Sequence, residues 1–286
     1  MTQDLNHLQK LGALGQSVWY DNMYRALIAT GELDRLLSLG VTGLTSNPTI
    51  FQKAISSGED YDDSLAEYAS RGLTADQLFE ALATEDIQAA ADILRPVYEQ
   101  TGGADGFASL EVSPRLAHDT DATVKAALRL FAALDRPNVM IKVPATPEGI
   151  PAIRELIGRG VNINVTLIFS LEMYARVREA YIAGLEDLDR AGGNVGAVAS
   201  VASFFVSRVD TAVDGLIEQR GGGLVSLMGK AAVANAKIAY QDFTETFGRE
   251  RFQSLARKGA RVQRPLWAST STKNPEYSDV LYVEAV

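Results

Sequence analysis

The 286-residue chain contains no cysteine and only two histidines. The absence of cysteine excludes disulfide bonds, thiolate catalysis and cysteine-ligated zinc. The two histidines, His7 and His118, are too few and too far apart in the sequence for a histidine metal site. We therefore expect no bound metal, and a nucleophile in this chain must be another kind of side chain.

Positive charge is scarce as well. Lysine and arginine number 27 against 36 aspartates and glutamates, which gives a net charge of −9. Nucleic acids and anionic membranes attract basic surfaces, so this balance argues against general binding to either. A local cationic pocket is still compatible with the total.

Long apolar runs are also missing. The longest, from Val195 to Val206, includes two serines and is shorter than the roughly 20 residues that a membrane span needs. The first residues, Met1 to His7, lack the basic and then apolar pattern of a secretory signal. The sequence therefore predicts a cytoplasmic protein.

No linker, low-complexity tract or internal repeat interrupts the chain, so a single domain over residues 1–286 is the simplest expectation. Short runs rich in valine, isoleucine, leucine and phenylalanine predict strands, and the amphipathic segments between them predict helices. The predicted strands are 17–21, 40–46, 106–112, 138–144, 161–169, 196–204 and 264–269. The predicted helices are 32–39, 76–100, 121–134, 148–158, 171–191, 206–219 and 226–247.

A series of this kind either closes into an eight-stranded barrel or opens as a doubly wound sheet. An open nucleotide-binding sheet should carry G-x-G-x-x-G after its first strand, but Asp21 is followed by Asn-Met-Tyr-Arg. A Walker-type loop is absent too, since Gly229-Lys230-Ala231 lacks the required glycine spacing. The sequence therefore favours an α/β fold of the TIM type, a (β/α)8 barrel.

Lys142 lies in Val-Met-Ile-Lys-Val-Pro-Ala, residues 139–145, a charge inside an otherwise apolar run. A strand buried on both faces disfavours an ammonium ion, so the group must be paired, neutralised or used chemically. A desolvated, neutral lysine can attack a carbonyl and form a Schiff base. Lys142 fits either a nucleophile or a structural lysine paired with Glu111 across the barrel.

Polar residues close several of the predicted strands, where a barrel carries its chemistry. Asp21 ends the first strand and Glu111 the third, and other polar residues at or near strand ends are Thr45, Ser46, Asn47, Asn164, Thr166, Ser203 and Arg208. Two carboxylates, one lysine and several amides suit Schiff-base carbonyl chemistry. The alternatives are structural, because lone strand-end carboxylates are often caps or ion pairs and Asn-Pro is typical of turns and helix starts.

Four segments together resemble the transaldolase family: LTSNPTIF at 44–51, SLEVS at 109–113, VMIKVPAT at 139–146 and NINVTLIFS at 162–170. Within that family the likeness is greater to the bacterial type that is also found fused to phosphoglucose isomerase. The resemblance implies a (β/α)8 barrel and an enzyme without a cofactor. That enzyme transfers a dihydroxyacetone unit from sedoheptulose 7-phosphate to glyceraldehyde 3-phosphate, yielding erythrose 4-phosphate and fructose 6-phosphate in the pentose phosphate pathway.

The resemblance also implies catalytic roles. Lys142 would be the Schiff-base lysine. Glu111 would be the acid/base, acting through a water that Thr166 helps to hold. Asp21 would serve the hydroxyl at the cleaved bond.

Substrate contacts follow from the same resemblance. Asn47 and Asn164 would hydrogen-bond the dihydroxyacetone unit, and Ser203 would contact substrate beside Phe205, which shapes the pocket. Arg208 would bind the phosphate, for which a guanidinium has bidentate geometry. The partners implied are a phosphorylated ketose and an aldose acceptor, with a homodimer left open and neither nucleic acid nor membrane expected.

Two departures from the family pattern affect these expectations. Where better-studied members have a second phosphate-binding arginine, this chain offers Lys273 with Ser271 nearby, and lysine binds phosphate as a point charge. We also expect strand eight to be missing and the barrel to be incomplete at its C-terminal end. The alternatives to a transaldolase are an inactive sugar-phosphate-binding barrel remnant and a related Schiff-base aldolase.

Overall fold

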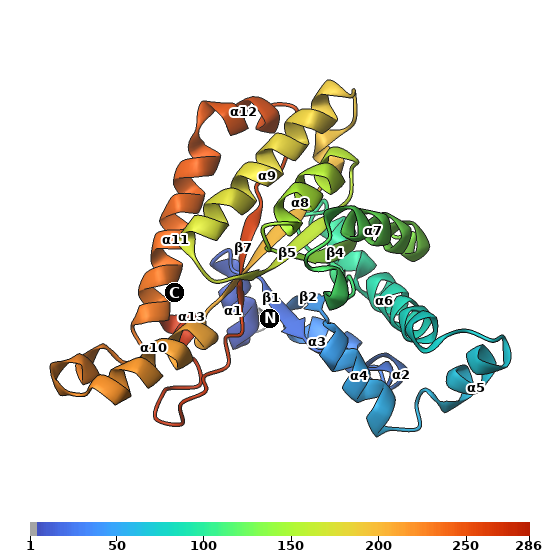
Figure 1. Cartoon of the computed structure of the whole chain (residues 1–286), viewed down its shortest axis with the longest axis horizontal. Coiled ribbons are helices and arrows are strands. Elements are labelled where there is room, and N and C mark those ends of the chain that lie inside the picture. Colours follow the sequence, from blue (N-terminus) through green and yellow to red (C-terminus); the bar gives the residue numbers. More distant parts are fainter. Residues whose placement is uncertain (1–4) are drawn as a thin grey trace. The chain divides into compact units, whose positions relative to one another are not determined.

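The computed structural model describes residues 5–286 (Figure 1). Residues 1–4, which belong to the predicted domain and to the start without a signal pattern, lie outside the described residues. All seven predicted strands are present. They are β1 (Val18–Asp21), β2 (Val41–Thr45), β3 (Ala108–Glu111), β4 (Val139–Pro144), β5 (Ile163–Ile168), β6 (Ser200–Phe205) and β7 (Arg264–Ala268).

The chain forms two compact units. Unit 1 comprises residues up to 116 together with 125–142, and unit 2 comprises 117–124 and 143–286, so that β4 begins in unit 1 and ends in unit 2. Parallel strands alternate with helices in both units, which is the (β/α) pattern of a TIM-type fold. Residues 5–286 form seven strands, and the eighth strand of a complete barrel is missing from this part of the chain.

The predicted helices are confirmed with small shifts at their ends. They are α3 (Glu32–Leu39), α6 (Ala75–Gln100), α7 (Thr120–Leu134), α8 (Gly149–Gly158), α9 (Leu171–Arg190), α10 (Ser207–Arg220) and α11 (Ala231–Gly248). Helix α11 begins five residues later than predicted, because the 3-10 helix η3 (Gly222–Leu227) and the left-handed Gly229, with φ +70°, precede it.

The remaining helices are short. They are α1 (His7–Ala13), α2 (Arg25–Ala29), α4 (Pro48–Ser57), α5 (Asp62–Ser70), α12 (Glu250–Ala256) and α13 (Leu281–Ala285), with the 3-10 helices η1 (Pro114–Leu116) and η2 (Val195–Ala197). Within residues 5–286, no helix combines the length and the apolar character that a membrane span requires.

Strands β1 to β4 of unit 1 are parallel neighbours in chain order. Gly43 of β2 lies against the Trp19 indole so closely that a Cβ there would stand 2.5 Å from the ring. The indole Nε1 donates to Asp105 at 2.7 Å, which links β1 to the start of the β3 segment. Glycine at position 43 therefore allows the large β1 side chain to lie flat on β2.

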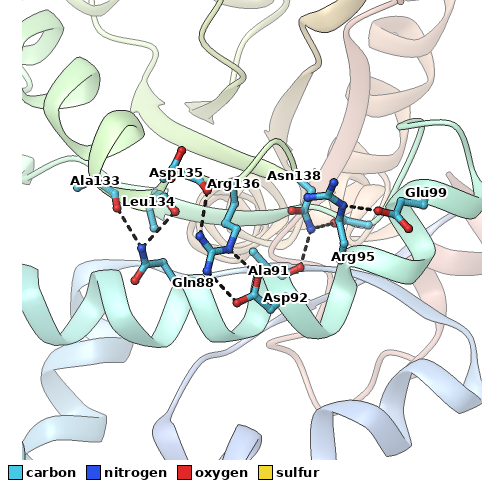
Figure 2. A network of polar contacts seen from close by, with 11 residues as sticks. Gln88, Ala91, Asp92, Arg95, Glu99, Ala133, Leu134, Asp135, Arg136 and Asn138 are labelled. Carbon is cyan, nitrogen blue, oxygen red and sulfur yellow. Dashed lines mark hydrogen bonds and ion pairs between the residues drawn. The ribbon is translucent and has the colours of Figure 1, made fainter.

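Helix α6 holds the connection that leads from α7 into β4 (Figure 2). The Gln88 side chain donates to the carbonyls of the last two residues of α7 at 3.0 and 3.2 Å. Arg136, in the connection itself, forms a fork of two hydrogen bonds with the Asp92 carboxylate. Planar, two-point pairing of this kind fixes orientation as well as distance.

Asn138 then sets the start of β4. Its buried side-chain amide donates to the carbonyl of Ala91 on α6 at 2.8 Å (Figure 2). The same amide donates to the carbonyl of Gly106, before β3, at 2.9 Å. Its own carbonyl accepts from the backbone N–H of Ala108 at 3.0 Å, the first rung of the β3–β4 ladder. Because side chains alternate along a strand, fixing this register also fixes which face Lys142 occupies, four residues later.

In unit 2, β5, β6 and β7 are parallel neighbours in chain order. Every residue of β6 is buried, whereas β7 is half-buried along its length. The Ser200 hydroxyl donates across the ladder to the carbonyl of Ile163 at 2.7 Å. These strands therefore form a well-covered sheet with one less protected member, β7.

Helices α8 and α9 of unit 2 lie side by side (Figure 1). The contact is close at Gly184 of α9, where a Cβ would stand 2.7 Å from the backbone carbonyl oxygen of Arg154 and from the Ile157 side chain. Arg251 of α12 pairs with two carboxylates of α9, Glu179 and Glu186. A residue without a side chain at 184 thus lets the two helix backbones approach.

We expect Gly184→Ala to lower the free energy of unfolding by about 1–3 kcal/mol, because the added methyl group overlaps a backbone atom that cannot rotate away. Gly215→Ala in α10 is the matched control, since among the described residues a Cβ built there has no neighbour within 4 Å beyond its adjacent residues and the backbone of its own helix. That control should raise stability by about 0.5–1 kcal/mol. Urea unfolding followed by circular dichroism measures both, and equal effects at the two sites would contradict the close approach.

Candidate active site

Lys142 and Glu111 occupy directly opposed positions on neighbouring strands of unit 1. Lys142 Nζ lies 3.3 Å from Glu111 Oε2, with side-chain exposures of 9% and 13%. The alternative considered from the sequence, a pairing of Lys142 with Glu111, is therefore present, and it joins register partners on the adjacent strands β4 and β3. A nearly buried amine beside a carboxylate suits both proton exchange and ion pairing.

A second acceptor faces the same amine. Lys142 Nζ donates to the backbone carbonyl of Ser46, the residue after β2, at 3.1 Å. The Ser46 hydroxyl donates in turn to the backbone carbonyl of Ser109 on β3 at 2.7 Å, and Ser46 is fully buried. The amine therefore has one charged acceptor and one neutral acceptor, contributed by two different strands' ends.

The Glu111 carboxyl is shifted toward its protonated form. Burial raises the pKa of Glu111, the neighbouring Lys142 opposes that rise, and the charge of Asp21 adds to it. A carboxyl with a raised pKa can hold a proton closer to neutral pH and give it up again. This is the behaviour that a general acid/base requires.

Asp21 ends β1 beside Thr45, its register partner at the end of β2. The Thr45 hydroxyl donates to Asp21 Oδ1 at 2.6 Å. Asp21 is exposed, so its second carboxylate oxygen is open to a solute as well as to water. The arrangement fixes the carboxylate without burying it.

Asn47 caps helix α4, with Pro48 as the first helical residue. Its side-chain Oδ1 accepts from the backbone N–H of Ile50 at 3.0 Å. The structural alternative considered from the sequence, a helix N-cap, is thus present. The cap uses one lone pair of Oδ1, so the two N–H groups of Nδ2 and the second lone pair of Oδ1 are the groups that could bond a substrate.

Unit 2 brings two of the other predicted site residues together. The Ser203 hydroxyl of β6 donates to Asn164 Oδ1 of β5 at 2.7 Å, and both residues are buried. Thr166 is buried as well, and its backbone carbonyl accepts from Ala145 N–H at 2.8 Å. Leu167, directly after it, has φ +60°, an uncommon conformation for leucine that interrupts the β5 register. The C-terminal end of β5 is therefore irregular in backbone conformation and in register.

Arg208, in the first turn of α10, lies with its guanidinium carbon 5.0 Å from the ring centre of Phe205. Phe205 in turn contacts Phe169, with ring centres 5.0 Å apart. Stacking on an aromatic face orients a guanidinium while leaving its N–H groups free for an anion. Arg208 is exposed, as a phosphate-binding group should be before ligand arrives.

Lys273 lies in a different environment. Its Nζ donates to Ser271 Oγ at 2.5 Å. It lines a cavity of about 330 Å³ together with Asp210, Asp214 and Glu218, and is the only cation among the described lining residues. Three nearby carboxylates make this cavity a poor environment for a phosphate.

A family model described as Transaldolase/Fructose-6-phosphate aldolase matches residues 18–286. Transaldolase 1 of Streptomyces avermitilis is 51% identical over 286 residues, covering 99% of this chain and 76% of the relative. Transaldolase of Saccharopolyspora erythraea is 52% identical, with 99% and 77% covered, and transaldolase of Trichodesmium erythraeum is 46% identical, with 98% and 76% covered.

The chain belongs to the transaldolase/fructose-6-phosphate aldolase family. The resemblance seen in the sequence is thereby confirmed over nearly the whole chain.

Sequence reasoning missed two contacts in unit 1, one made by Thr45 and one by Ser46. Thr45 and Ser46 were noted as strand-end residues, but neither was assigned to the site. Their only sequence signal is their place between an apolar strand and the Asn-Pro helix start. That position indicates proximity to the site, but it does not show that Thr45 holds Asp21 or that the Ser46 carbonyl faces Lys142.

The raised pKa of Glu111 predicts a pH dependence of stability. The folded state binds this proton more tightly than the unfolded state. The stability that the protonated Glu111 carboxyl contributes is therefore fully present below the ordinary glutamate pKa. It is lost as pH rises toward the raised value. The difference in unfolding free energy between the unsubstituted protein and Glu111→Gln should therefore fall as pH rises through that window. Urea unfolding across pH 4–8 measures the difference.

Glu148→Gln is the control for this titration. Glu148 has a lowered pKa, because its carboxylate accepts from its own backbone N–H and pairs with His118. Its stabilising effect is lost as pH falls, so any slope should have the opposite sign. Slopes of the same sign for both glutamates would show that the titration of Glu111 is not the cause.

Proposed function

We propose that this chain is a transaldolase that transfers a dihydroxyacetone unit between sugar phosphates through a Schiff base on Lys142. The observation that carries the proposal is the buried amine of Lys142 in register with Glu111, in a chain of this family. A nucleophilic amine and a proton donor within hydrogen-bonding reach are what imine formation requires. The proposal keeps the pentose phosphate pathway and the cytoplasmic location expected from the sequence.

The first step joins Lys142 to the ketose. The lone pair of the neutral Nζ adds to the ketone carbon, and the carbonyl electrons move to oxygen. That oxygen leaves as water with one amine proton and one proton supplied by Glu111, and a protonated imine remains. The raised pKa of Glu111 suits this donation and the return of the proton in hydrolysis.

The second step breaks the carbon–carbon bond. Asp21 takes the proton of the hydroxyl next to that bond, the aldose leaves as an aldehyde, and the bonding electrons move into the imine to form an enamine. The Thr45 hydrogen bond to Oδ1 leaves Oδ2 of Asp21 for this proton. When an acceptor aldehyde arrives, the enamine carbon adds to it, and its oxygen takes the proton back from Asp21.

The residues of unit 2 keep the roles that the resemblance implies, as part of this proposal. Asn164 and Ser203 would bind the dihydroxyacetone unit. The hydrogen bond from the Ser203 hydroxyl to Asn164 Oδ1 fixes the orientation of the Asn164 amide for this contact. Thr166 would help to hold the water through which Glu111 acts. Arg208 is better supported than Lys273 as the phosphate contact, because it is exposed and stacked whereas Lys273 lies among carboxylates.

Borohydride reduction in the presence of fructose 6-phosphate should attach a carbon chain to Lys142 and abolish activity, because reduction makes the imine permanent. Peptide mass mapping locates the label. Lys142→Met should take up none, while Lys125→Met, a change at an exposed lysine of α7, should label as the unsubstituted protein does. A label elsewhere, or none in the folded protein, would overturn the assignment.

The acceptor distinguishes a transaldolase from an aldolase of the same family. A transaldolase should hold the dihydroxyacetone unit on Lys142 until erythrose 4-phosphate is added, and then form sedoheptulose 7-phosphate. Release of free dihydroxyacetone without an acceptor would instead favour the aldolase. Binding of fructose 6-phosphate without either product would favour an inactive, sugar-phosphate-binding protein.

Asp21→Asn should separate the two chemical steps. An amide cannot take the hydroxyl proton, so imine formation should continue while bond cleavage falls by about 100-fold or more. After borohydride reduction, mass spectrometry should therefore find mainly the intact six-carbon adduct on Lys142, in place of the three-carbon adduct of the unsubstituted protein. A three-carbon adduct formed at the original rate would remove Asp21 from the cleavage step.

A further inference from the structure

We infer that Ser46 is a positioning residue for Lys142: its backbone carbonyl aims the amine, and its side-chain hydroxyl holds that carbonyl in place. The inference rests on the proposed Schiff-base function and adds a residue to it. Two hydrogen bonds carry it, from Lys142 Nζ to Ser46 O at 3.1 Å and from Ser46 Oγ to Ser109 O at 2.7 Å.

The first bond matters because of the shape of an amine. A neutral Nζ has two N–H groups and one lone pair in a tetrahedral arrangement, and only the lone pair attacks a carbonyl. Glu111 gains and loses a proton in the reaction, so its role as donor or acceptor changes. A backbone carbonyl can only accept. The Ser46 carbonyl therefore holds one N–H in the same direction in every protonation state.

The same carbonyl suits the product of the addition. A protonated imine is planar at nitrogen and carries a single N–H. If that N–H stays on the Ser46 carbonyl, the plane of the imine and the side from which the aldose departs are both set. Alignment of this kind lowers the barrier without changing how tightly the substrate binds.

The second bond explains how the carbonyl is held. The β2–β3 ladder pairs Leu44 with Ala108 and Thr45 with Ser109, and Ser46 is the next residue of the chain. Directly after it, Asn47 caps helix α4. Ser46 thus lies where a strand gives way to a helix, and its buried hydroxyl extends the attachment to β3 by one residue.

A comparable bond elsewhere provides a matched control. Ser200 on β6 is also buried, and its hydroxyl donates to the carbonyl of Ile163 at 2.7 Å. The Ser200 hydroxyl donates over the same distance as the Ser46 hydroxyl, and it also accepts from Gln263 Nε2 at 2.9 Å. Neither Ile163 nor Gln263 has a role in the proposed mechanism. Ser200→Ala should therefore lower stability at least as much as Ser46→Ala does, because it also removes the acceptor of Gln263, yet only Ser46→Ala should change catalysis.

The experiment is single-turnover imine formation with fructose 6-phosphate, stopped with borohydride at successive times and read as label on Lys142. Ser46→Ala should slow the rate constant by about 10-fold, while the final amount of label per folded protein and the dissociation constant for fructose 6-phosphate stay unchanged. Ser200→Ala should leave the rate constant unchanged. A merely structural role would lower the amount of label or the melting temperature and not the rate constant.

A second variant tests the carbonyl directly. Replacing the Ser46–Asn47 amide by an ester keeps both side chains but makes the Ser46 carbonyl a weaker acceptor, and it should slow imine formation in the same way. If the unsubstituted protein forms no imine on Lys142, the proposed function fails. If it does and both Ser46 variants react at its rate, the positioning role alone is overturned.

Discussion

The arrangement of unit 1 depends on burying the amine of Lys142 beside the carboxyl of Glu111. Removing two charged groups from water costs several kcal/mol for each ion, and their attraction offsets that cost only with good geometry and further hydrogen bonds. Here the two are register partners on adjacent strands, and the amine has a second acceptor in Ser46. The unrelieved part of the cost is expressed in the raised pKa of Glu111. The same burial that is unfavourable for stability is what makes the pair suitable for proton transfer.

The short side chains at the end of β2 serve this pair in a way that larger residues could not. Thr45 reaches sideways to Asp21, and Ser46 reaches to the β3 backbone while presenting its carbonyl to the amine. Hydroxyl groups can bond to a neighbouring strand without adding charge to a site that already holds three ionisable groups. Helix α6 contributes from farther away, because the anchored start of β4 determines the register in which Lys142 meets Glu111.

Much of this was predictable from local pattern. The seven strands were predicted from apolar runs, and the lysine was found because a charge interrupts one of them. The start of α11 was not, because the predicted range began at Ser226, inside the 3-10 helix η3, and the left-handed Gly229 separates η3 from α11. Lys273 was assigned to phosphate from its position in the chain, whereas its surroundings, Asp210 and Asp214 among them, come from α10 and could not be read from the loop.

The sequence by itself determined the TIM-type alternation, the family, and the candidate nucleophile with its two carboxylates. These follow from residue type and order, since hydrophobic periodicity and a charge in a buried strand are local properties. The tertiary structure alone decided that Glu111 is the register partner of Lys142 and that Ser46 supplies the second acceptor. Every residue carries the same backbone carbonyl, so only the folded register can determine which of them faces the amine.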